Sequence, residues 1–366
     1  MLHIIAGAGL GGVETFVRNA AQHTDRNDIE ITVCVLGREG PLADSLRDAG
    51  VGVDILGLAP DASAIQRTIA VIPFVARSRA DIVHISCGRS GLRRIVRGTG
   101  AKYVVSHVHG FPDDWIAAVR GRQALPLRST YVDAATHVVA SSRWVAQSLS
   151  GVAQTNVIPY GVPIPRSSPR RSDTGDVVAG FLGRLVPQKG LTYLLDAAKS
   201  ALARNERLRF VIAGDGPLAD DVRKSAAGLP PGRCTLTGAR HDVDAFMKEI
   251  DFLVVPSEWE AFGIVAIEAQ SYARPVVGFR VDGLPEAVAD GETGVLVPHR
   301  DTAALANAIV KLADDTGVRA RMGAAGRARV ASLFSAPAMV RRLGDFYATV
   351  MSGASHNVAG PFHRDV

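Results

Sequence analysis

Hydrophobic positions along the chain fall into short continuous runs and into runs spaced like one face of a helix. An apolar run at residues 2–6 is followed by glycine-rich residues 7–12 and then by residues 13–22, whose apolar positions recur at helical spacing. The same order of strand, loop and helix recurs at residues 177–202. We therefore expect each half of the chain to begin with an α/β unit.

Further short apolar runs predict additional strands in both halves. The runs are continuous rather than alternating, which is typical of parallel strands whose sheet is covered on both faces. The predicted fold class is therefore α/β, with a parallel sheet in each half and ligands at the carboxyl ends of the strands. The runs lie at residues 31–37, 81–86, 102–110 and 136–141 in the first half and at 209–214, 252–257 and 275–279 in the second.

The two halves are separated by residues 166–176, which are rich in proline, serine and charge and have the composition of an exposed linker. This division predicts an N-terminal domain over residues 1–165 and a second domain over residues 177–335. A last helical pattern, at residues 336–352, is expected to pack back toward the first domain. Residues 353–366 have no periodicity and are expected to form a tail.

Composition supports a globular chain of two domains. Of the 366 residues, 47% are hydrophobic and 21% are charged, so apolar side chains suffice to offset the entropy lost on folding. The cysteines, Cys34, Cys87 and Cys234, are an odd number without metal-ligand spacing, and we expect buried thiols in a reducing cytoplasm. The longest apolar run, residues 68–76, is too short to span a bilayer. We expect a protein that is soluble or peripheral to a membrane.

The stretch most informative about chemistry is residues 255–270. Glu260 follows a predicted strand, and Glu268 lies in an apolar helical segment, where a carboxylate is costly unless something binds it. Gly263 permits close approach of a ligand to the backbone. A sugar or ribose diol supplies the donors that a carboxylate needs, and a helix N-terminus offers amides to a diphosphate. The alternative is that Glu268 is a capping or surface carboxylate.

Glu260 and Glu268, with seven residues between them, match the paired-glutamate motif of retaining GT-B enzymes, and residues 257–269 closely resemble glycosyltransferase family 4. Ala261 stands where the family usually has a glycine. The resemblance covers nearly the whole chain and is weaker over residues 29–128, where the acceptor would bind. It implies the GT-B fold, two Rossmann-like parallel-sheet domains facing across a cleft. It also implies transfer of a hexosyl group from a nucleoside-diphosphate sugar to an acceptor hydroxyl, with retention of configuration.

The resemblance extends to a donor-phosphate loop at residues 183–191, in which Arg184 and Lys189 would give positive charge to the leaving diphosphate. By resemblance, Glu260 holds donor-sugar hydroxyls and Glu268 grips the ribose. A solvated surface cation is the alternative for each basic residue, and a surface role is equally open for Glu286. The predicted donor-binding residues are Gly11, Gly12, Gly183, Arg184, Lys189, Gly214, Arg240, Glu260, Phe262, Gly263, Ile264, Val265 and Glu268.

In the first half, a predicted strand ends at residues 106–110, and His109 matches the family's active-site histidine. His107 points to the same side of a regular strand, and a structural role is the alternative for both histidines. The predicted catalytic residues are His109, Arg184, Lys189 and Glu260.

No Asp-x-Asp follows a predicted strand, so we expect neither a metal nor a cofactor. Arg184, Lys189 and helix-end amides would then stabilise the leaving group. By resemblance, the departing phosphate helps to take the acceptor proton.

Three rival functions remain open from the sequence. Gly7, Gly9 and Gly12 have dinucleotide-fingerprint spacing, but the acid expected after the next strand, near Leu36, is missing, which argues against an NAD-dependent oxidoreductase. A GT-B sugar-nucleotide epimerase would need further acid/base carboxylates, which the sequence does not place. A non-catalytic sugar-nucleotide-binding protein would share the binding residues, although His109 together with both cations favours an enzyme.

Basic residues gather in one part of the chain. Residues 77–128 contain ten basic residues and three acids, whereas residues 1–76 contain five basic residues and nine acids. A solvated face is the simple explanation, and nucleic acid is not expected because no recognition motif or aromatic platform accompanies the charge. Our hypothesis is an anionic membrane at the cytoplasmic face, with a glycan or lipid-linked acceptor close to His109. The basic residues are Arg77, Arg79, Arg89, Arg93, Arg94, Arg97, Lys102, Arg120, Arg122 and Arg128.

Overall fold

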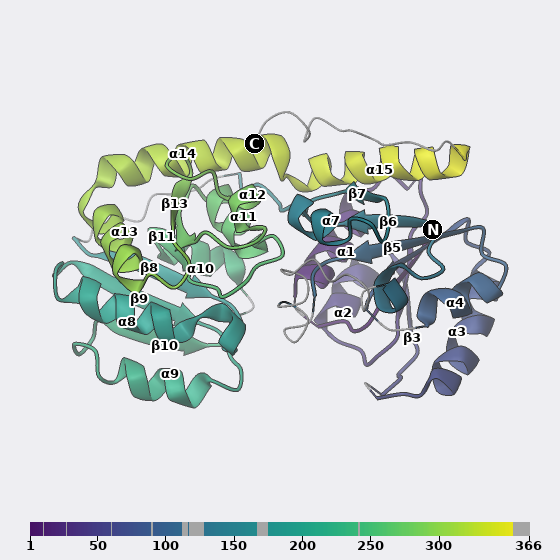
Figure 1. Ribbon diagram of the computed structural model, residues 1–366, viewed down its shortest axis with the longest axis horizontal. Helices are drawn as coiled ribbons and strands as arrows, with labels where there is room; N and C mark the ends of the chain where they lie inside the picture. The colour runs from purple at the N-terminus through teal and green to yellow at the C-terminus, as the bar shows by residue number, and fades with distance from the viewer. Residues whose placement is uncertain are drawn as a thin grey trace. The chain divides into compact units, whose positions relative to one another are not determined.

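The structure, a computed structural model, describes residues 1–9, 11–26, 28–59, 61–88, 91–111, 116, 128–166, 175–240 and 242–353. The chain forms two compact units: unit 1 contains Met1–Gly161 and Ala336–Val366, and unit 2 contains Val162–Ser335. Each unit is built on a parallel sheet with helices packed on it, which confirms the predicted α/β class (Figure 1). The expected linker lies largely, and the expected tail almost entirely, outside the described residues.

In unit 1 the described residues form a seven-stranded sheet with the order β3-β2-β1-β4-β5-β6-β7. The strands are β1 (Leu2–Ile5), β2 (Thr32–Val35), β3 (Gly52–Ile55), β4 (Ile82–Ser86), β5 (Tyr103–Val108), β6 (His137–Ala140) and β7 (Thr155–Val157). The helices are α1 (Gly12–His23), α2 (Pro41–Asp48), α3 (Ala64–Ser78), α4 (Leu92–Gly98), α7 (Arg143–Ser148) and α15 (Ala336–Ser352), with a π-helical turn, η2, at Arg128–Val132.

In unit 2 the described residues form a six-stranded sheet with the order β10-β9-β8-β11-β12-β13. The strands are β8 (Val177–Leu182), β9 (Leu208–Ala213), β10 (Cys234–Gly238), β11 (Phe252–Val255), β12 (Val276–Phe279) and β13 (Gly294–Val297). The helices are α8 (Leu191–Leu202), α9 (Ala219–Ala226), α10 (Val243–Glu249), α11 (Ile264–Ser271), α12 (Leu284–Ala287), α13 (Thr302–Asp314) and α14 (Thr316–Leu333), with a 3₁₀ turn, η3, at Pro187–Lys189.

The central strands are buried along their whole length, as their continuous apolar sequences predict. Every residue of β1 and β4 in unit 1, and of β11 and β12 in unit 2, is buried. Helices on both faces exclude water from these strands, so each position needs an apolar side chain or a satisfied polar one. The cysteines follow the same rule in part. Cys34 and Cys87 are buried, whereas Cys234 is half-buried and departs from the expectation.

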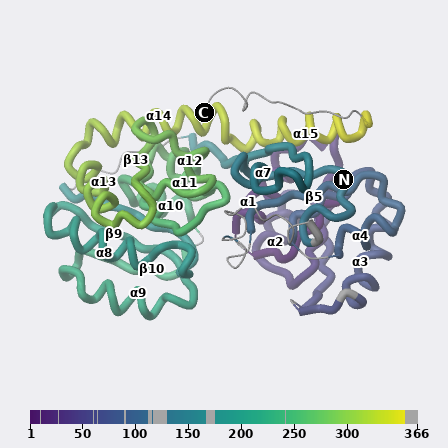
Figure 2. The backbone as a smooth tube through the Cα atoms, viewed as in Figure 1, coloured from purple at the N-terminus to yellow at the C-terminus, as the bar shows by residue number. Residues whose placement is uncertain are grey.

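Helix α15 belongs to unit 1 although it follows the whole of unit 2 in the sequence. The backbone runs from unit 1 into unit 2 and returns to unit 1 at Ala336 (Figure 2). Helix α15 packs along α1 and lies over the sheet, where Tyr347 hydroxyl hydrogen-bonds with His84 Nδ1 at 2.7 Å. The amide of Gly161 donates to Met339 sulfur at 3.1 Å, so the end of the first segment of unit 1 is tied to the start of the second.

Gly190 shows how closely the loops at the carboxyl ends of the strands pack in unit 2. It separates η3 from α8 in the left-handed conformation, with φ of 66°, which is costly for other residues. A Cβ at this position would lie 1.9 Å from the Pro256 carbonyl oxygen, which follows β11. Both the backbone conformation and the contact therefore require glycine.

We predict that Gly190→Ala lowers the free energy of unfolding by about 3 kcal/mol or more, because backbone strain and steric overlap add. The matched control is Gly232→Ala in the same unit, where φ is 72° and a Cβ would meet nothing within 4 Å. The control should lose only about 1 kcal/mol. Urea unfolding measures both, and equal losses in the two variants would contradict the contact with Pro256.

Candidate functional site

In unit 2, most of the predicted donor-site residues follow neighbouring strands of the sheet. Arg184 follows β8, Gly214 follows β9, Glu260 follows β11 and Glu286 lies in α12 after β12. The order β9-β8-β11-β12 makes these strands neighbours, and all pair in parallel, so their carboxyl ends meet at one edge. The strand order reverses between β8 and β11, which is where open parallel sheets bind ligands.

Lys189 and Glu260 are in direct contact across this reversal point. Lys189 Nζ donates to Glu260 Oε1 at 2.5 Å, and Ser257 Oγ donates to the same oxygen at 2.9 Å. The side chains of Lys189 and Glu260 are 19% and 9% exposed. The other oxygen, Glu260 Oε2, makes no hydrogen bond with any described residue, so the carboxylate is held at one oxygen and open at the other.

The loop that contains Glu260 is fixed by backbone contacts on two sides. The amide of Glu258 donates to the Gln188 carbonyl at 2.8 Å, and Gln188 Nε2 donates to the Trp259 carbonyl at 3.2 Å. On the other side, the amide of Gly283 donates to the Glu260 carbonyl at 2.9 Å. The loop after β8 and the turn after β12 therefore both hold the loop on which Glu260 lies.

Glu258 is a structural anchor that sequence reasoning missed. Its carboxylate accepts from Tyr193 hydroxyl at 2.7 Å and from Arg300 Nη2 at 2.8 Å, and His299 Nε2 lies 3.0 Å from it. Partial burial raises the pKa of Glu258, but the bonds from Arg300 and Tyr193 outweigh it and hold the pKa below its usual value. These partners lie far away in the sequence, so no local spacing could have revealed them.

Arg184 and Arg240 differ in what they already bind. Arg184 is exposed and makes no hydrogen bond or ion pair with any described residue. In contrast, Arg240 Nη1 lies 2.5 Å from Glu249 Oε2, and the guanidinium lies 5.6 Å from the ring centre of Phe246. The charge of Arg184 is thus available to an anion, whereas that of Arg240 is shared with a neighbour.

Helix α11 presents one partly exposed face made by Ile264, Val265 and Glu268, because Glu268 lies one helical turn after the other two. Glu268 is half-buried on this face, so its carboxylate is buried at a smaller cost than its apolar sequence neighbours suggest. The adjacent residues Ala266, Ile267 and Ala269 are buried on the other face. Glu286 is also half-buried. No described side chain caps the start of α11. The amide of Ala266 donates to the Gly263 carbonyl at 3.0 Å, which leaves the amides of Ile264 and Val265 for other acceptors.

Phe262 and Gly263 have structural roles at the start of α11. Phe262 is buried, with its ring 5.3 Å from that of Phe334, so only its backbone can face a ligand. Gly263 has φ of 97°, and a Cβ there would lie 2.7 Å from Leu284 Cδ1. The fold itself therefore requires this glycine. The amide of Gly183 donates to the Ala213 carbonyl of β9 at 3.1 Å, and the amide of Gly214 donates to the Gly238 carbonyl of β10 at 2.8 Å.

In unit 1, His109 lies at the carboxyl end of β5 and both of its ring nitrogens are engaged. Nδ1 hydrogen-bonds with Tyr160 hydroxyl at 2.8 Å and Nε2 with Ser86 Oγ at 3.0 Å. His3 Nε2 reaches the same Ser86 oxygen at 2.8 Å. His107 stacks on His109 with ring centres 3.9 Å apart, which confirms that the two histidines point to one side of the strand. His3 and Ser86 are site neighbours that the sequence did not indicate.

Four buried histidines of unit 1 are neutral at pH 7: His3, His84, His107 and His109. Burial lowers the pKa of His3 and of His109 to about 3, and it lowers the pKa of His84 and His107 well below the usual range. His84 Nε2 lies 3.2 Å from His107 Nδ1, whereas His107 Nε2 is buried and makes no hydrogen bond with any residue that the structure describes. Imidazoles in this state can exchange hydrogen bonds with hydroxyls, but they bring no positive charge.

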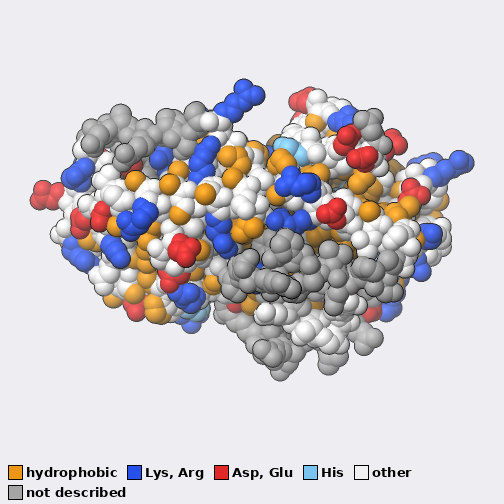
Figure 3. Space-filling model, turned by 90° about the horizontal axis from the view of Figure 1, so that it is seen from above, with side chains coloured by type: hydrophobic (Ala, Val, Ile, Leu, Met, Phe, Trp, Pro, Cys, Tyr) orange, Lys and Arg blue, Asp and Glu red, His pale blue; other side chains and the backbone are white. Residues whose placement is uncertain are grey.

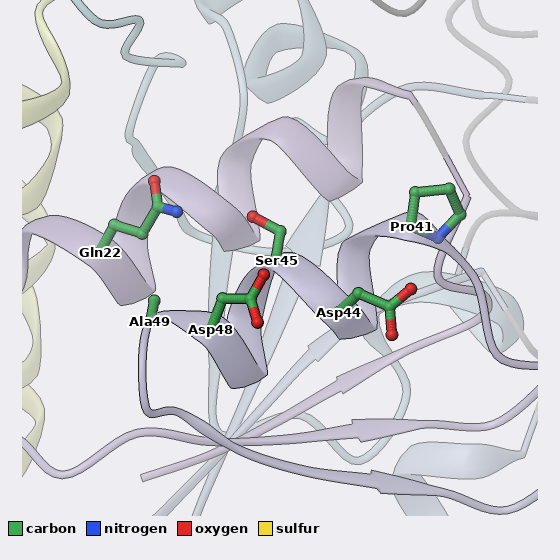
Figure 4. Close-up of a pocket in the computed structure, with 6 residues that line it drawn as sticks. All are labelled: Gln22, Pro41, Asp44, Ser45, Asp48 and Ala49. Carbon is green, nitrogen blue, oxygen red and sulfur yellow. The ribbon is translucent and has the colours of Figure 1, made fainter.

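Gly11 and Gly12 begin α1 after β1, and no side chain caps that helix. A pocket of about 570 Å³ between α1 and α2 is lined by Gln22, Pro41, Asp44, Ser45, Asp48 and Ala49, none of which is a predicted site residue (Figure 4).

Among the described residues, no group of three His, Cys, Asp or Glu could hold a metal ion. Nor does any described helix have the length and apolarity to cross a bilayer.

Two family models match the chain. Residues 11–161 match the glycosyl transferase 4-like domain, and residues 176–315 match the glycosyl transferases group 1 domain. The chain belongs to the group 1 glycosyltransferases. Among solved structures, this glycosyltransferase is similar to Alr3699/HepE of Anabaena in complex with UDP and glucose, with a TM-score of 0.78 and 20% identity over 95% of this chain and 99% of that one. That similarity shows the GT-B fold.

Curated relatives of the glycosyltransferase are similar over parts of their length. Alpha-D-kanosaminyltransferase of Streptomyces kanamyceticus is 34% identical over 171 residues, which is 46% of this chain and 44% of the relative. The UDP-Gal:alpha-D-GlcNAc-diphosphoundecaprenol alpha-1,3-galactosyltransferase of Escherichia coli is 28% identical over 305 residues, 75% of this chain and 78% of the relative. For three of the relatives, the match spans less than half of their length, at 44%, 37% and 46%.

The neutral histidines of the glycosyltransferase predict a pH-dependent stability. Below about pH 6.5 the unfolded chain binds protons that the folded chain does not bind until about pH 3, so the free energy of unfolding falls as pH falls through this range. Each such histidine should contribute about 1.4 kcal/mol per pH unit. Urea unfolding at pH 7.5 and 5.5, above the range of ordinary carboxylates, measures the loss.

The variant His107→Asn provides the comparison, because an asparagine can keep the bond to His84 while the unpartnered buried nitrogen is removed. The free energy of unfolding of this variant should fall less steeply as pH falls, because unfolding takes up about one proton fewer. A wild-type stability that stays flat between pH 7.5 and 5.5 would contradict neutral burial of the cluster.

Proposed function

We propose that this protein transfers a sugar from a nucleoside-diphosphate sugar to an acceptor hydroxyl, with retention of anomeric configuration and without a metal. The observation that supports this most directly is the Lys189–Glu260 contact at the reversal of strand order in unit 2, beside the exposed cation Arg184. A cationic group and a carboxylate at this point suit the two ends of a nucleotide-sugar: the diphosphate and the sugar hydroxyls.

The cations would act on the leaving group. Negative charge on the diphosphate grows as the glycosidic bond breaks, so a fixed positive charge stabilises the transition state more than the bound substrate. Arg184 is exposed without a partner among the described residues, and Lys189 is held in place by Glu260. The uncapped start of α11 adds amide donors and the positive end of a helix dipole.

Glu260 would bind the donor sugar. Lys189 and Ser257 donate to Oε1, whereas Oε2 remains available to accept from a hydroxyl of a bound sugar. Because the loop that carries Glu260 is fixed from two sides, the carboxylate is oriented before the sugar arrives, which limits the reorganisation that catalysis requires. Glu268, half-buried on the face of α11, would accept from the ribose hydroxyls.

The donor and acceptor are proposed from the relatives. The structurally similar protein of Anabaena was solved with UDP and glucose, and the relative of Escherichia coli is named for a UDP-galactose donor and a diphosphoundecaprenol acceptor. We therefore propose a UDP-sugar as donor and a glycan or lipid-linked acceptor. The reaction would belong to cell-surface polysaccharide or glycolipid synthesis in the cytoplasm, at the cytoplasmic face of the membrane.

Arg184→Ala, Lys189→Ala and Glu260→Gln should each lower the turnover number by at least about a hundredfold, the scale of losing one electrostatic contact to a transition state. Release of UDP from UDP-glucose or UDP-galactose, by hydrolysis or transfer, provides the assay. Lys199→Ala removes an exposed cation from α8 and should leave turnover unchanged. Near-wild-type turnover in either cation variant would remove that residue from the phosphate site.

UDP should raise the midpoint of thermal unfolding more than GDP or ADP, because a ligand that binds only the folded state stabilises it. The shift should persist in excess EDTA, as should UDP release. A larger shift with GDP or ADP would overturn the choice of base. Loss of activity in EDTA, with recovery on adding magnesium or manganese, would overturn the metal-free mechanism.

A further inference from the structure

Helix α3 exposes three large hydrophobic side chains. Ile65 is 72% exposed, Ile69 is 69% exposed and Ile72 is 37% exposed. They are spaced by four and three residues, so they form one stripe along the helix. The opposite side, with Val71 and Val75, is buried in the core of unit 1.

The start of the helix, where Ile65 and Ile69 lie, is fixed by a capping box, and Pro73 lies inside the helix after Ile72. Ser63 and Gln66 make a capping box at its start, in which each side chain bonds the backbone of the other. Among the described residues, Met351 is the other large hydrophobic side chain that is exposed. Single exposed apolar residues are common, but a continuous stripe on a regular helix points to a partner.

Basic side chains lie at the C-terminal end of this stripe. Arg77 is in the last turn of α3, and Arg79 follows it. Strand β4 begins with Ile82 paired to Tyr103 of β5, so the residues that precede these strands lie together at one edge of the sheet. Arg97 lies in the last turn of α4, and Lys102 lies between α4 and β5. Because α3 packs beside α4, both are near the end of α3 (Figure 1). Between residues 64 and 102, Asp81 is the one acid in the sequence.

The structure also corrects the basic segment predicted from sequence. Arg93 is 2% exposed, and its guanidinium donates to Ser106 Oγ and to the carbonyls of Cys87 and Thr130. It cannot contact a membrane, because it is buried inside unit 1, where these hydrogen bonds satisfy its guanidinium. Arg94 is paired with Asp133 at 2.6 Å.

Arg89, Arg120 and Arg122 lie outside the described residues, as does the side chain of Arg128. The exposed basic residues that remain near α3 are Arg77, Arg79, Arg97 and Lys102.

We propose that a lipid bilayer with anionic headgroups docks on this α3 surface, defined as Ile65, Ile69, Ile72, Arg77, Arg79, Arg97 and Lys102. An amphipathic helix with an apolar stripe and flanking Lys or Arg lies in the membrane interface, with the apolar face in the acyl boundary and the cations at headgroup phosphates. By contrast, on the face seen in Figure 3 basic, acidic and hydrophobic side chains are interspersed, as on an ordinary solvated surface.

Two other partners fit this surface less well. A second copy of the chain in a symmetric contact would bring the same cations together, and like charges would repel. Nucleic acid would use the cations but not the isoleucines, since it is bound by charge and aromatic stacking. A bilayer uses both features at once. The proposal does not rest on sugar transfer, and vesicle binding tests it without an activity assay.

The test is co-sedimentation of the full chain with vesicles of phosphatidylcholine containing about 30% phosphatidylglycerol, compared with phosphatidylcholine alone. Binding should require the anionic lipid and weaken as salt rises, because the charged part of the attraction is screened. Ile65→Ser plus Ile69→Ser should weaken binding by at least about tenfold. Ile65→Leu plus Ile69→Leu, which keeps the apolar stripe, should bind like wild type.

Charge is tested by two variants with the same change in net charge. Arg77→Glu plus Lys102→Glu should weaken binding to anionic vesicles by at least about tenfold. Lys199→Glu plus Lys224→Glu reverses two exposed lysines of unit 2 and should bind like wild type. Thermal unfolding of every variant checks that the fold is kept.

Three results would overturn the proposal: equal binding to neutral vesicles, unchanged binding of the serine variant, or the same loss in both charge-reversed variants. Sedimentation velocity adds a fourth. A dimer that the serine variant abolishes, without vesicle binding, would assign the stripe to a second copy of this chain.

Discussion

The reversal of strand order between β8 and β11 is the constraint on which the candidate site of unit 2 depends. Helices that follow the strands on either side of such a point leave toward opposite faces of the sheet, so the loops at the carboxyl ends separate and leave room for a ligand. Lys189 and Glu260 reach each other across this point. A cation and a carboxylate that are far apart in the sequence thus become neighbours because of topology.

Rigidity around that contact comes from packing rather than from the two charges themselves. Gly190 lies so close to the Pro256 carbonyl that no side chain fits, and Glu258 binds Tyr193 and Arg300 from other elements. These contacts fix the loop on which Glu260 lies. A site that is ordered before its ligand arrives does not have to reorganise during the reaction, and this is a main source of electrostatic catalysis.

The sequence predicted the central strands, because continuous apolar runs are local signals, but it missed β3, β7 and β13, which lie at sheet edges and are less fully buried. The motif around Glu260 is also a local signal, and the site built on it stays a prediction. The sequence could not predict which side chains meet. The partners of Glu258 and the cluster around His109 come from separate strands and helices, and only the folded sheet brings them together. Counting charges along the chain also failed for Arg93, because the count does not show that its guanidinium is buried and fully bonded.

The two units differ in how they prepare their polar groups. Unit 2 places charged side chains at the end of its sheet, whereas unit 1 places neutral imidazoles there. Ser86 has one proton and meets both His3 and His109, so it donates to one ring and accepts from the other. If Ser86 donates to His3, then His109 must donate through Nε2, and its Nδ1 must accept from Tyr160. If Ser86 donates to His109, each of these bonds reverses. The positions of the protons along this series of hydrogen bonds are therefore coupled, and a ligand hydroxyl that replaced one partner would set the tautomer of His109.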